Sequence, residues 1–227
     1  MATSYSPKII TDGLVLCLDA GDGKSYSGSG TTWTDRSGNG YNGTLSNNPS
    51  FVSSDNCFDF DGADDLCRTT LPVSELDRDC TVIITCTVEG VGGDASTANR
   101  LFSMDRTFNS TKWCIGTRTG TNTIQFSGGG GGDDTNANFT YSLNEIFQVA
   151  LVLDGTGHKL YKNANLESSG SPAGDSSNFG FASVGCRPNS TDRIWNGKIF
   201  NVMAYNRQLT DAEILQNYNA TKSRFQL

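Results

Sequence analysis

The chain changes from a strand pattern to a helix pattern near its C-terminus, in residues 194–218, and this change constrains the fold more than any other feature. Apolar side chains crowd residues 198–205, where Ile199, Phe200 and Val202 stand among few polar residues. Such crowding is typical of a largely buried strand rather than a surface helix. We therefore expect a buried strand that leads directly into a helix.

The helix that follows carries its own start signal. Thr210 precedes the helical pattern and Glu213 stands at its third position, so that each side chain can accept a hydrogen bond from the other's backbone N–H. Ile214, Leu215 and Tyr218 then fall on one helical face. A helix of about three turns is not stable alone in water, so we expect this face to dock on the sheet.

Composition and spacing indicate one all-β domain over residues 1–227. A chain of this length with 26 Gly and 5 Pro fits a sandwich or barrel. The expected strands are residues 13–19, 56–61, 79–89, 100–105, 112–118, 122–127, 145–154, 157–163, 179–186 and 194–205. Short turns between them, such as Asp154-Gly155, predict antiparallel neighbours in two packed sheets.

Two segments interrupt the strand pattern. Residues 20–50 are rich in small turn-forming residues. Residues 128–138 begin with five glycines and lack the following helix and Lys-Ser/Thr pair of a phosphate-binding loop. We interpret the second segment as a mobile loop.

Charge and cysteine usage limit the partners and the compartment. The net charge of −7, without a basic cluster, argues against a nucleic-acid partner. The N-terminal residues lack the features of a secretory signal, and no apolar run is long enough for membrane insertion. The cysteines stand mostly in apolar strand patterns without metal-like spacing, and we expect buried thiols in a chain folded in a reducing cytoplasm. They are Cys17, Cys57, Cys67, Cys80, Cys86, Cys114 and Cys186.

Several motifs occur in a familiar order along the chain. They are Gly13-Leu-Val-Leu-Cys-Leu-Asp-Ala-Gly21, the segment from Trp33 to Leu45, Phe58-Asp-Phe-Asp-Gly62, Phe147-Gln-Val-Ala-Leu-Val-Leu-Asp154, Lys159-Leu-Tyr-Lys-Asn163 and the C-terminal ending. Together they resemble the concanavalin A-like jelly rolls of the laminin-G-like class. The resemblance implies a two-sheet antiparallel β-sandwich with a short C-terminal helix.

The ending Ala204-Tyr-Asn-Arg-Gln-Leu209, with residues 214–224, is similar to structural proteins of tailed bacteriophages. This resemblance implies a non-enzymatic protein exposed on the virion surface after folding in the host cytoplasm. Its partners would be virion capsid or tail proteins, in a capsid decoration or a tail or fibre adhesin, and host surface glycans could be bound as well.

A glycoside hydrolase is the least favoured alternative. Retaining hydrolysis needs two carboxylates about 5 Å apart in a cleft, and the nearest pair is Glu75 and Asp79. We interpret their segment as a polar turn or short helical loop, and the chain lacks the Glu-x-Asp-x-x-Glu run of glucanases with this fold. The single histidine, His158, is expected in an exposed hairpin turn, so we expect no catalytic site.

Calcium is a possible cofactor by resemblance. Relatives hold the ion with the Asp of a Phe-Asp-Gly segment, which Asp61 matches, and Asp64 and Asp65 stand close behind. Such oxygen-rich loops suit a hard cation. Phe200, however, replaces the acidic residue that those relatives carry in the penultimate strand. Asp61-Gly62 can also be read as a tight turn.

The main alternative function is a calcium-assisted module that recognises bacterial surface polysaccharide. Sugar sites combine aromatic faces with polar groups on loops or open sheets. Trp33, Tyr41, Trp113 and Arg118 are the candidate residues. Each tryptophan also stands beside strand-like residues, where core packing is the favoured explanation because large aromatic side chains are usually buried.

Overall fold

A computed structural model describes most of the chain. The described residues are 7–77, 79–90, 99–107, 110–118, 120–128, 135–170, 180–187 and 193–227. Six residues of the glycine-rich segment, 129–134, lie outside them. The expected mobile loop stays a prediction for these six residues, but it is wrong for the rest of residues 128–138, because Gly128 ends one strand and residues 135–138 belong to the next.

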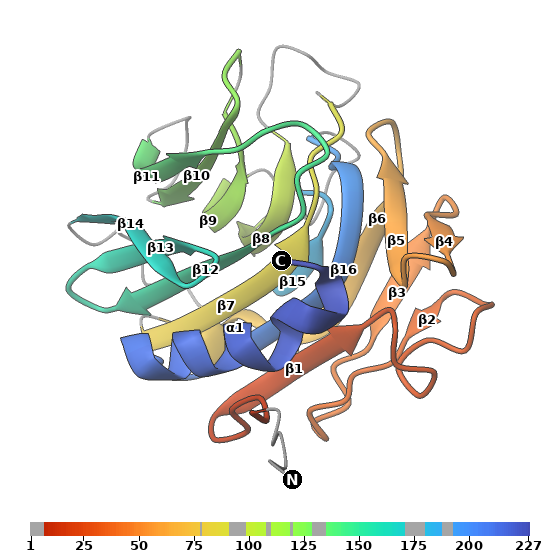
Figure 1. Cartoon of the computed structure of the whole chain (residues 1–227), viewed down its shortest axis with the longest axis horizontal. Helices are drawn as coiled ribbons and strands as arrows, with labels where there is room; N and C mark the ends of the chain where they lie inside the picture. The colour runs from red at the N-terminus through yellow and green to blue at the C-terminus, as the bar shows by residue number, and fades with distance from the viewer. Residues whose placement is uncertain are drawn as a thin grey trace, which may run out of the picture.

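The strands form two antiparallel sheets that face one another (Figure 1). Sheet A has the order β14-β13-β12-β7-β16-β5-β4, and β1 also pairs with β16. Its strands are β1 Leu14–Asp19, β4 Ser50–Val52, β5 Cys57–Asp61, β7 Asp79–Cys86, β12 Phe147–Asp154, β13 His158–Lys162, β14 Asn165–Gly170 and β16 Asn196–Tyr205. Sheet B has the order β11-β10-β9-β8-β15-β6-β3-β2. Its strands are β2 Thr32–Trp33, β3 Gly43–Ser46, β6 Leu66–Pro72, β8 Arg100–Thr107, β9 Ser110–Thr117, β10 Thr123–Gly128, β11 Thr135–Thr140 and β15 Phe181–Val184.

Every strand expected from the sequence is present, so the predicted antiparallel sandwich is confirmed. Sequence patterns missed β2, β3, β4, β6, β11 and β14. Strands β2, β3 and β4 are only two to four residues long, and β11 and β14 are rich in threonine, serine and asparagine. Strand β6 is longer, but Arg68, Thr69 and Thr70 interrupt its apolar pattern. Strand β14 is almost wholly exposed and has no buried face to mark it.

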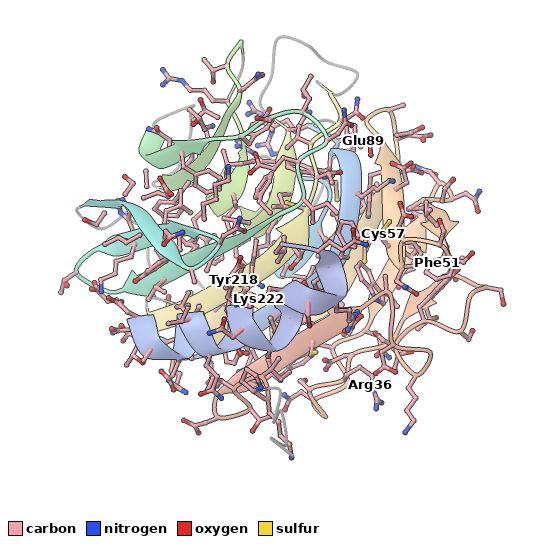
Figure 2. All side chains as sticks on the ribbon, in the orientation of Figure 1. Arg36, Phe51, Cys57, Glu89, Tyr218 and Lys222 are labelled. Atoms are coloured by element: carbon pink, nitrogen blue, oxygen red, sulfur yellow. The ribbon has the colours of Figure 1, made fainter. Side chains whose placement is uncertain are left out.

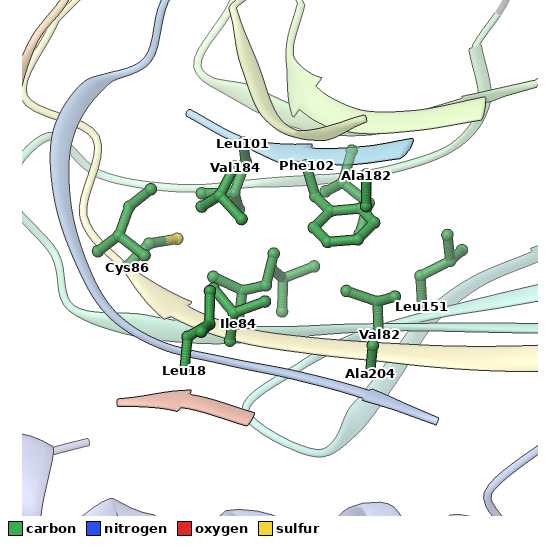
Figure 3. Packing of buried hydrophobic residues seen from close by; sticks show 14 of the residues in the cluster. Leu18, Val82, Ile84, Cys86, Leu101, Phe102, Leu151, Ala182, Val184 and Ala204 are labelled. Carbon is green, nitrogen blue, oxygen red and sulfur yellow. The ribbon is translucent and has the colours of Figure 1, made fainter. Parts of the chain in front are cut away.

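One hydrophobic cluster fills the space between the sheets (Figure 3). Sheet A contributes Leu18, Val82 and Ala204, and sheet B contributes Phe102 and Val184 from the facing strands. All five are fully buried. Because the cluster draws on strands from both ends of the chain, neither sheet can bury its apolar face without the other.

Helix α1, Asp211–Phe225, lies across the outer face of sheet A (Figure 1). The predicted capping box is confirmed: Thr210 Oγ1 accepts from the Glu213 backbone N–H at 3.3 Å, and Glu213 Oε2 accepts from the Thr210 N–H at 2.8 Å. The predicted docking face is partly wrong. Ile214 is buried, but Leu215 is 49% exposed.

The buried stripe of α1 consists of Ile214, Asn217, Thr221 and Phe225. Its polar members are satisfied internally, because Asn217 Oδ1 accepts from the Ile10 N–H at 2.8 Å and Asn217 Nδ2 donates to the Tyr205 hydroxyl. Hydrogen bonds as well as apolar contacts therefore determine which face of α1 is buried. Apolar periodicity in the sequence does not reveal the polar part of this face. None of the helices within the described ranges is long and apolar enough to cross a membrane.

Candidate functional site

The two tryptophans predicted to stack on sugars are core residues. Trp33 is fully buried, with its ring edge-on to Phe58 at 4.8 Å between ring centroids. Trp113 is 3% exposed and stacks on Phe102 at 5.6 Å. Neither indole offers a free face, so their burial corrects the sequence-based assignment of both to a sugar site.

The other two predicted sugar contacts lie far apart in the strand order of sheet B. Tyr41 precedes β3, is partly buried, and donates its hydroxyl proton to Glu75 Oε1 at 3.1 Å. Arg118 is exposed at the β9–β10 turn, where its backbone N–H donates to the Thr123 carbonyl. The structure does not bring the four predicted residues together.

The three predicted calcium ligands do meet. Carboxylate oxygens of Asp61, Asp64 and Asp65 lie within 4.8 Å of one another. Asp61 Oδ1 accepts from the backbone N–H groups of Ala63 and Asp64, and Asp65 Oδ2 accepts from that of Asp61. With Gly62 at a positive φ of 75°, this is the tight turn that the alternative reading proposed.

The donor set of this turn fits a hard cation. Burial, together with the adjacent Asp61 and Asp64 carboxylates, raises the pKa of the Asp65 carboxyl to about 6, against the opposing hydrogen bond from the Asp61 backbone N–H. A divalent cation would relieve that repulsion, and hard oxygen ligands are those that calcium prefers. Asp61, Asp64 and Asp65 would hold the ion, with water completing the shell.

The neighbouring strand, β16, supplies no carboxylate beside Asp61. Opposite Asp61, strand β16 places Asn196. Phe200 lies further along β16, where it is 3% exposed and packs edge-on against Phe225 at 5.4 Å between ring centroids. This aromatic contact joins the sheet to the last turn of α1.

The two candidate hydrolase residues, Glu75 and Asp79, form hydrogen bonds with different partners. Glu75 lies in a 3₁₀ helix, Val73–Leu76, as the predicted helical loop implies, and Asp79 accepts a hydrogen bond from Gln208 Nε2 at 2.9 Å. The expectation for His158 is wrong. It is 3% exposed at the start of β13, with its ring 5.0 Å from that of Phe126, because the hairpin turn ends one residue earlier.

A pocket of about 450 Å³ opens on the outer face of sheet A, where α1 ends. The helix covers this face as far as Phe225, and Gln226 then turns the chain away with a φ of 57°. Figure 2 shows Glu89 and Cys57 beyond the C-terminal end of the helix. The pocket is lined by Ser54, Asp55, Asn56, Thr87, Glu89, Asn144, Ile146, Lys198, Phe200, Arg224, Phe225 and Gln226. We call it the α1-end pocket.

Strand β16, the segments at the ends of its neighbours β7 and β5, the segment before β12 and the end of helix α1 form this pocket. In sheet A, β16 lies between β7 and β5, so Lys198 on β16 comes between Thr87, just after β7, and Asp59 on β5. The Lys198 N–H donates to Thr87 Oγ1 at 2.9 Å, which fixes the edge of the floor. Ile146 supplies its accessible apolar part, packed on Phe200 and Phe225, which are each only 3% exposed.

Both cations of the α1-end pocket are already paired. Lys198 Nζ lies 2.7 Å from Asp55 Oδ2, and this contact lowers the pKa of Asp55. The Arg224 guanidinium is hydrogen-bonded to the Asp19 carboxylate and lies 4.5 Å from the Phe225 ring centroid. Lys198 and Arg224 therefore line the pocket as members of ion pairs with Asp55 and Asp19.

Two carboxylates at this pocket lack such a cation. Burial raises the pKa of Glu89, which lines the pocket, and the Asp59 carboxylate raises it further. Burial likewise raises the pKa of Asp59, against the opposing effect of Lys198. Among the described residues, neither carboxylate forms an ion pair like that of Asp55.

The sequence carries only an indirect sign of this site, the departure of Phe200 from the calcium-binding pattern. The other pocket residues come from three connecting segments, from strand β16 and from the C-terminal end of α1. No local spacing connects them.

Comparisons with solved structures agree on the architecture. A Trypanosoma rangeli sialidase in complex with sialic acid superposes with a TM-score of 0.73 at 15% identity, covering 97% of this chain and 36% of that one. The binding domain of botulinum neurotoxin serotype D superposes with a TM-score of 0.69 at 16% identity, covering 93% of this chain and 52% of that one. The chain thus spans about a third of the sialidase and about half of the toxin domain.

Sequence comparison assigns the family. Among curated proteins, none matches the chain. The family profile of the concanavalin A-like lectin/glucanases superfamily, Laminin_G_3, matches residues 78–215, which is more than half of the sequence. With the two antiparallel sheets and the C-terminal helix, this match shows that the chain belongs to the concanavalin A-like lectin/glucanases superfamily.

Proposed function

We propose that this protein is a non-enzymatic, lectin-like domain that binds a carbohydrate in the α1-end pocket. The observation that carries the proposal is the pocket itself, which combines about 450 Å³ of space with a polar rim and the partly exposed apolar side chain of Ile146. Sugar ligands need this combination, because their C–H faces pack on apolar groups while their hydroxyls need fixed donors and acceptors. The superfamily and the sialic-acid-bound neighbour are consistent with it.

The rim of the pocket offers hydrogen-bonding groups of both kinds. Asn56 and Asn144 provide exposed amides, and Glu89 provides a carboxylate. Both asparagines hold positive φ angles, 58° and 63°, in tight turns next to sheet A. Turn backbones of this kind are fixed in place by the strands they join.

A glycan array and a panel of bacterial polysaccharides test this proposal. Ser54 lines the pocket and Ser53 does not, although both are exposed in the β4–β5 turn. We expect saturable glycan binding by the native protein, its loss in Ser54→Trp, and its retention in Ser53→Trp. Equal binding by both variants would place the sugar elsewhere, and no binding by the native protein would overturn the function.

The non-enzymatic part is tested separately. Every bound polysaccharide is incubated with the protein and assayed for new reducing ends. We expect none above the level of a heat-unfolded sample. Release that disappears in Glu89→Gln would make the pocket catalytic and would contradict this part of the proposal.

Calcium binding at Asp61, Asp64 and Asp65 is a separate proposal, resting on their convergence. We expect calcium, added after chelation, to raise the melting temperature of the native protein and to have no effect on Asp64→Asn. Glu167→Gln, which changes an exposed carboxylate on β14, is the matched control and keeps the response. No calorimetric heat and no stabilisation in the native protein would remove calcium from the account.

We also propose a place for the domain on the virion surface, docked on a capsid or tail protein. The proposal rests on the resemblance of the C-terminal ending to structural proteins of tailed bacteriophages. The large apolar side chains exposed on separate segments, which a partner could cover one at a time, are Leu143, Leu166, Phe181 and Leu215, at 49–57% exposure.

Proteomics of density-purified virions tests this location. We expect the chain in intact particles, and reduced occupancy when Leu215 on α1 is changed to Asp. Ser223→Asp, at another exposed position of the same helix, is the control. A chain that stays in the soluble fraction of the lysate and never bands with particles would contradict a virion role.

A further inference from the structure

Negative charge exceeds positive charge around the α1-end pocket. Four carboxylates, those of Asp19, Asp55, Asp59 and Glu89, stand near two cations, Lys198 and Arg224. The two close ion pairs use one carboxylate for each cation. Asp59 and Glu89 have no cation in close contact within the described ranges, although the Thr87 side chain is hydrogen-bonded to the Glu89 carboxylate.

The pairing also explains why Lys198 does not neutralise Glu89. Its ammonium is held at 2.7 Å from Asp55, and this hydrogen bond is the main cause of its raised pKa. Glu89 contributes least to that rise. Lys198 is therefore directed toward the β4–β5 turn, and the Glu89 side of the pocket keeps its negative charge.

Glu89 is held in a defined place for recognition. Its backbone N–H donates to the Asn196 carbonyl at 2.9 Å, which continues the pairing of β7 with β16 beyond the end of the strand. The Asn144 N–H donates to the Val88 carbonyl at 2.8 Å and ties the opposite rim to the same segment. A carboxylate on so fixed a backbone can meet a ligand donor without much loss of conformational freedom.

From this geometry we infer that the α1-end pocket selects sugars that carry a protonated amine, with Glu89 as the residue that recognises the ammonium group. The inference rests on the proposed carbohydrate function and names its ligand class. The sugar ring packs beside Ile146, the partly exposed apolar side chain of the lining, and the Glu89 carboxylate accepts charge-assisted hydrogen bonds from the amine. A neutral sugar donates only hydroxyl hydrogen bonds to this carboxylate, without the charge of an ammonium group, and an acidic sugar is repelled by it.

Chitosan and chitin oligosaccharides of equal length are the decisive probes, because they share one backbone and differ in whether the amine is free or acetylated. Titration calorimetry measures both over a pH series from mildly acidic to neutral, because low pH protonates the amine whereas the raised pKa of Glu89 makes its carboxylate lose charge at low pH. We expect the free-amine oligosaccharide to bind at least about tenfold more tightly, the scale of one charge-assisted hydrogen bond.

Glu89→Gln is the test variant and Glu167→Gln on exposed β14 the control, since each removes one carboxylate of the same size. We expect Glu89→Gln to erase the preference for the free amine while leaving chitin binding unchanged, and Glu167→Gln to keep the preference. Circular dichroism and the melting temperature of both variants confirm that they are folded.

The outcomes separate the inference from the proposed function. Equal binding of both oligosaccharides, lost in Ser54→Trp, would overturn amine selection and leave the carbohydrate site standing. Binding of neither, in a protein that binds no glycan on the array, would overturn both. Equally tight binding of a simple aliphatic diamine would overturn selection of a sugar, because charge alone would then explain the affinity.

Discussion

Asp35 shows at the scale of one residue how the turn-rich segment before β3 is held in place. Its Oδ1 accepts from the backbone N–H groups of Cys17 and Ser37, and its Oδ2 accepts from the Ser37 hydroxyl and the Tyr41 N–H. The side chain is 6% exposed. The Asp35 carboxylate has a structural role: its four hydrogen bonds hold the segment to β1 and compensate for the burial of its charge.

Gly43, at the end of the same segment, has no room for a side chain. A Cβ built there would lie 2.5 Å from the Cys67 sulfur, whereas one at Gly23 would meet nothing within 4 Å. We predict that Gly43→Ala lowers the free energy of unfolding by about 1–3 kcal/mol through overpacking, and that Gly23→Ala changes it little. Urea denaturation measures both.

A second substitution checks the cause. Because the obstruction is the sulfur of Cys67, the double variant Gly43→Ala/Cys67→Ala should lose less stability than the two single changes added together. Strict additivity would show that the crowding at Gly43 has been absorbed elsewhere.

At the scale of an element, α1 is fastened by charge at its first turn. Arg207 forms an ion pair with Glu213, the capping-box residue, at 2.6 Å. This contact, together with the Thr210 backbone N–H, lowers the pKa of Glu213 from 4.5 to about 2. The carboxylate therefore stabilises the folded state when it is ionised.

The shifted pKa predicts an acid-sensitive helix. The stabilisation is fully present above about pH 4.5, the unfolded value, and is lost as the pH falls toward about 2. Between about pH 5 and about pH 3 the native protein should lose more stability than Glu213→Gln, by up to about 1 kcal/mol for a partly exposed pair. Thermal unfolding at the two pH values measures this.

A cap variant provides the comparison within the same element. Thr210→Ala removes the acceptor for the Glu213 N–H and should cost about 1 kcal/mol at neutral pH. Parallel pH profiles for the native protein and Glu213→Gln would mean that the ion pair with Arg207 contributes nothing measurable to folding.

At the scale of the whole molecule, the cysteines report on the integrity of the sandwich. All seven are free thiols, six of them are buried, and Cys17 is partly buried. Burial raises the pKa of both the Cys17 and the Cys57 thiols to about 12. The sequence-based prediction of buried thiols is thereby confirmed, while the reducing compartment stays a prediction.

We predict that the native protein reacts very slowly with Ellman's reagent and that all seven thiols react together once both sheets unfold. Low reactivity follows from the scarcity of thiolate and from the lack of access. The reaction is followed at increasing guanidinium concentration, beside circular dichroism. Rapid reaction of several thiols before the loss of β-structure would show that one sheet opens independently.

The sequence by itself determined the features that depend on near neighbours in the chain. The capping box of α1 was predictable because Thr210 and Glu213 are three residues apart. The central strands β7, β12 and β16 were predictable because continuous apolar runs must be buried. The turn at Asp61 and Gly62 and the order of motifs were equally local.

Only the tertiary structure decided which residues face one another across the sheets. It placed Trp33 and Trp113 in the core. Burial of a large aromatic side chain is favourable, and the strand pattern around each tryptophan does not say which face of the strand is buried. It also made the α1-end pocket, whose walls come from segments more than one hundred residues apart, such as Asp55 and Lys198. The pocket exists because α1 stops at Phe225 before sheet A ends, and that distance is set by packing between elements, which no local pattern encodes.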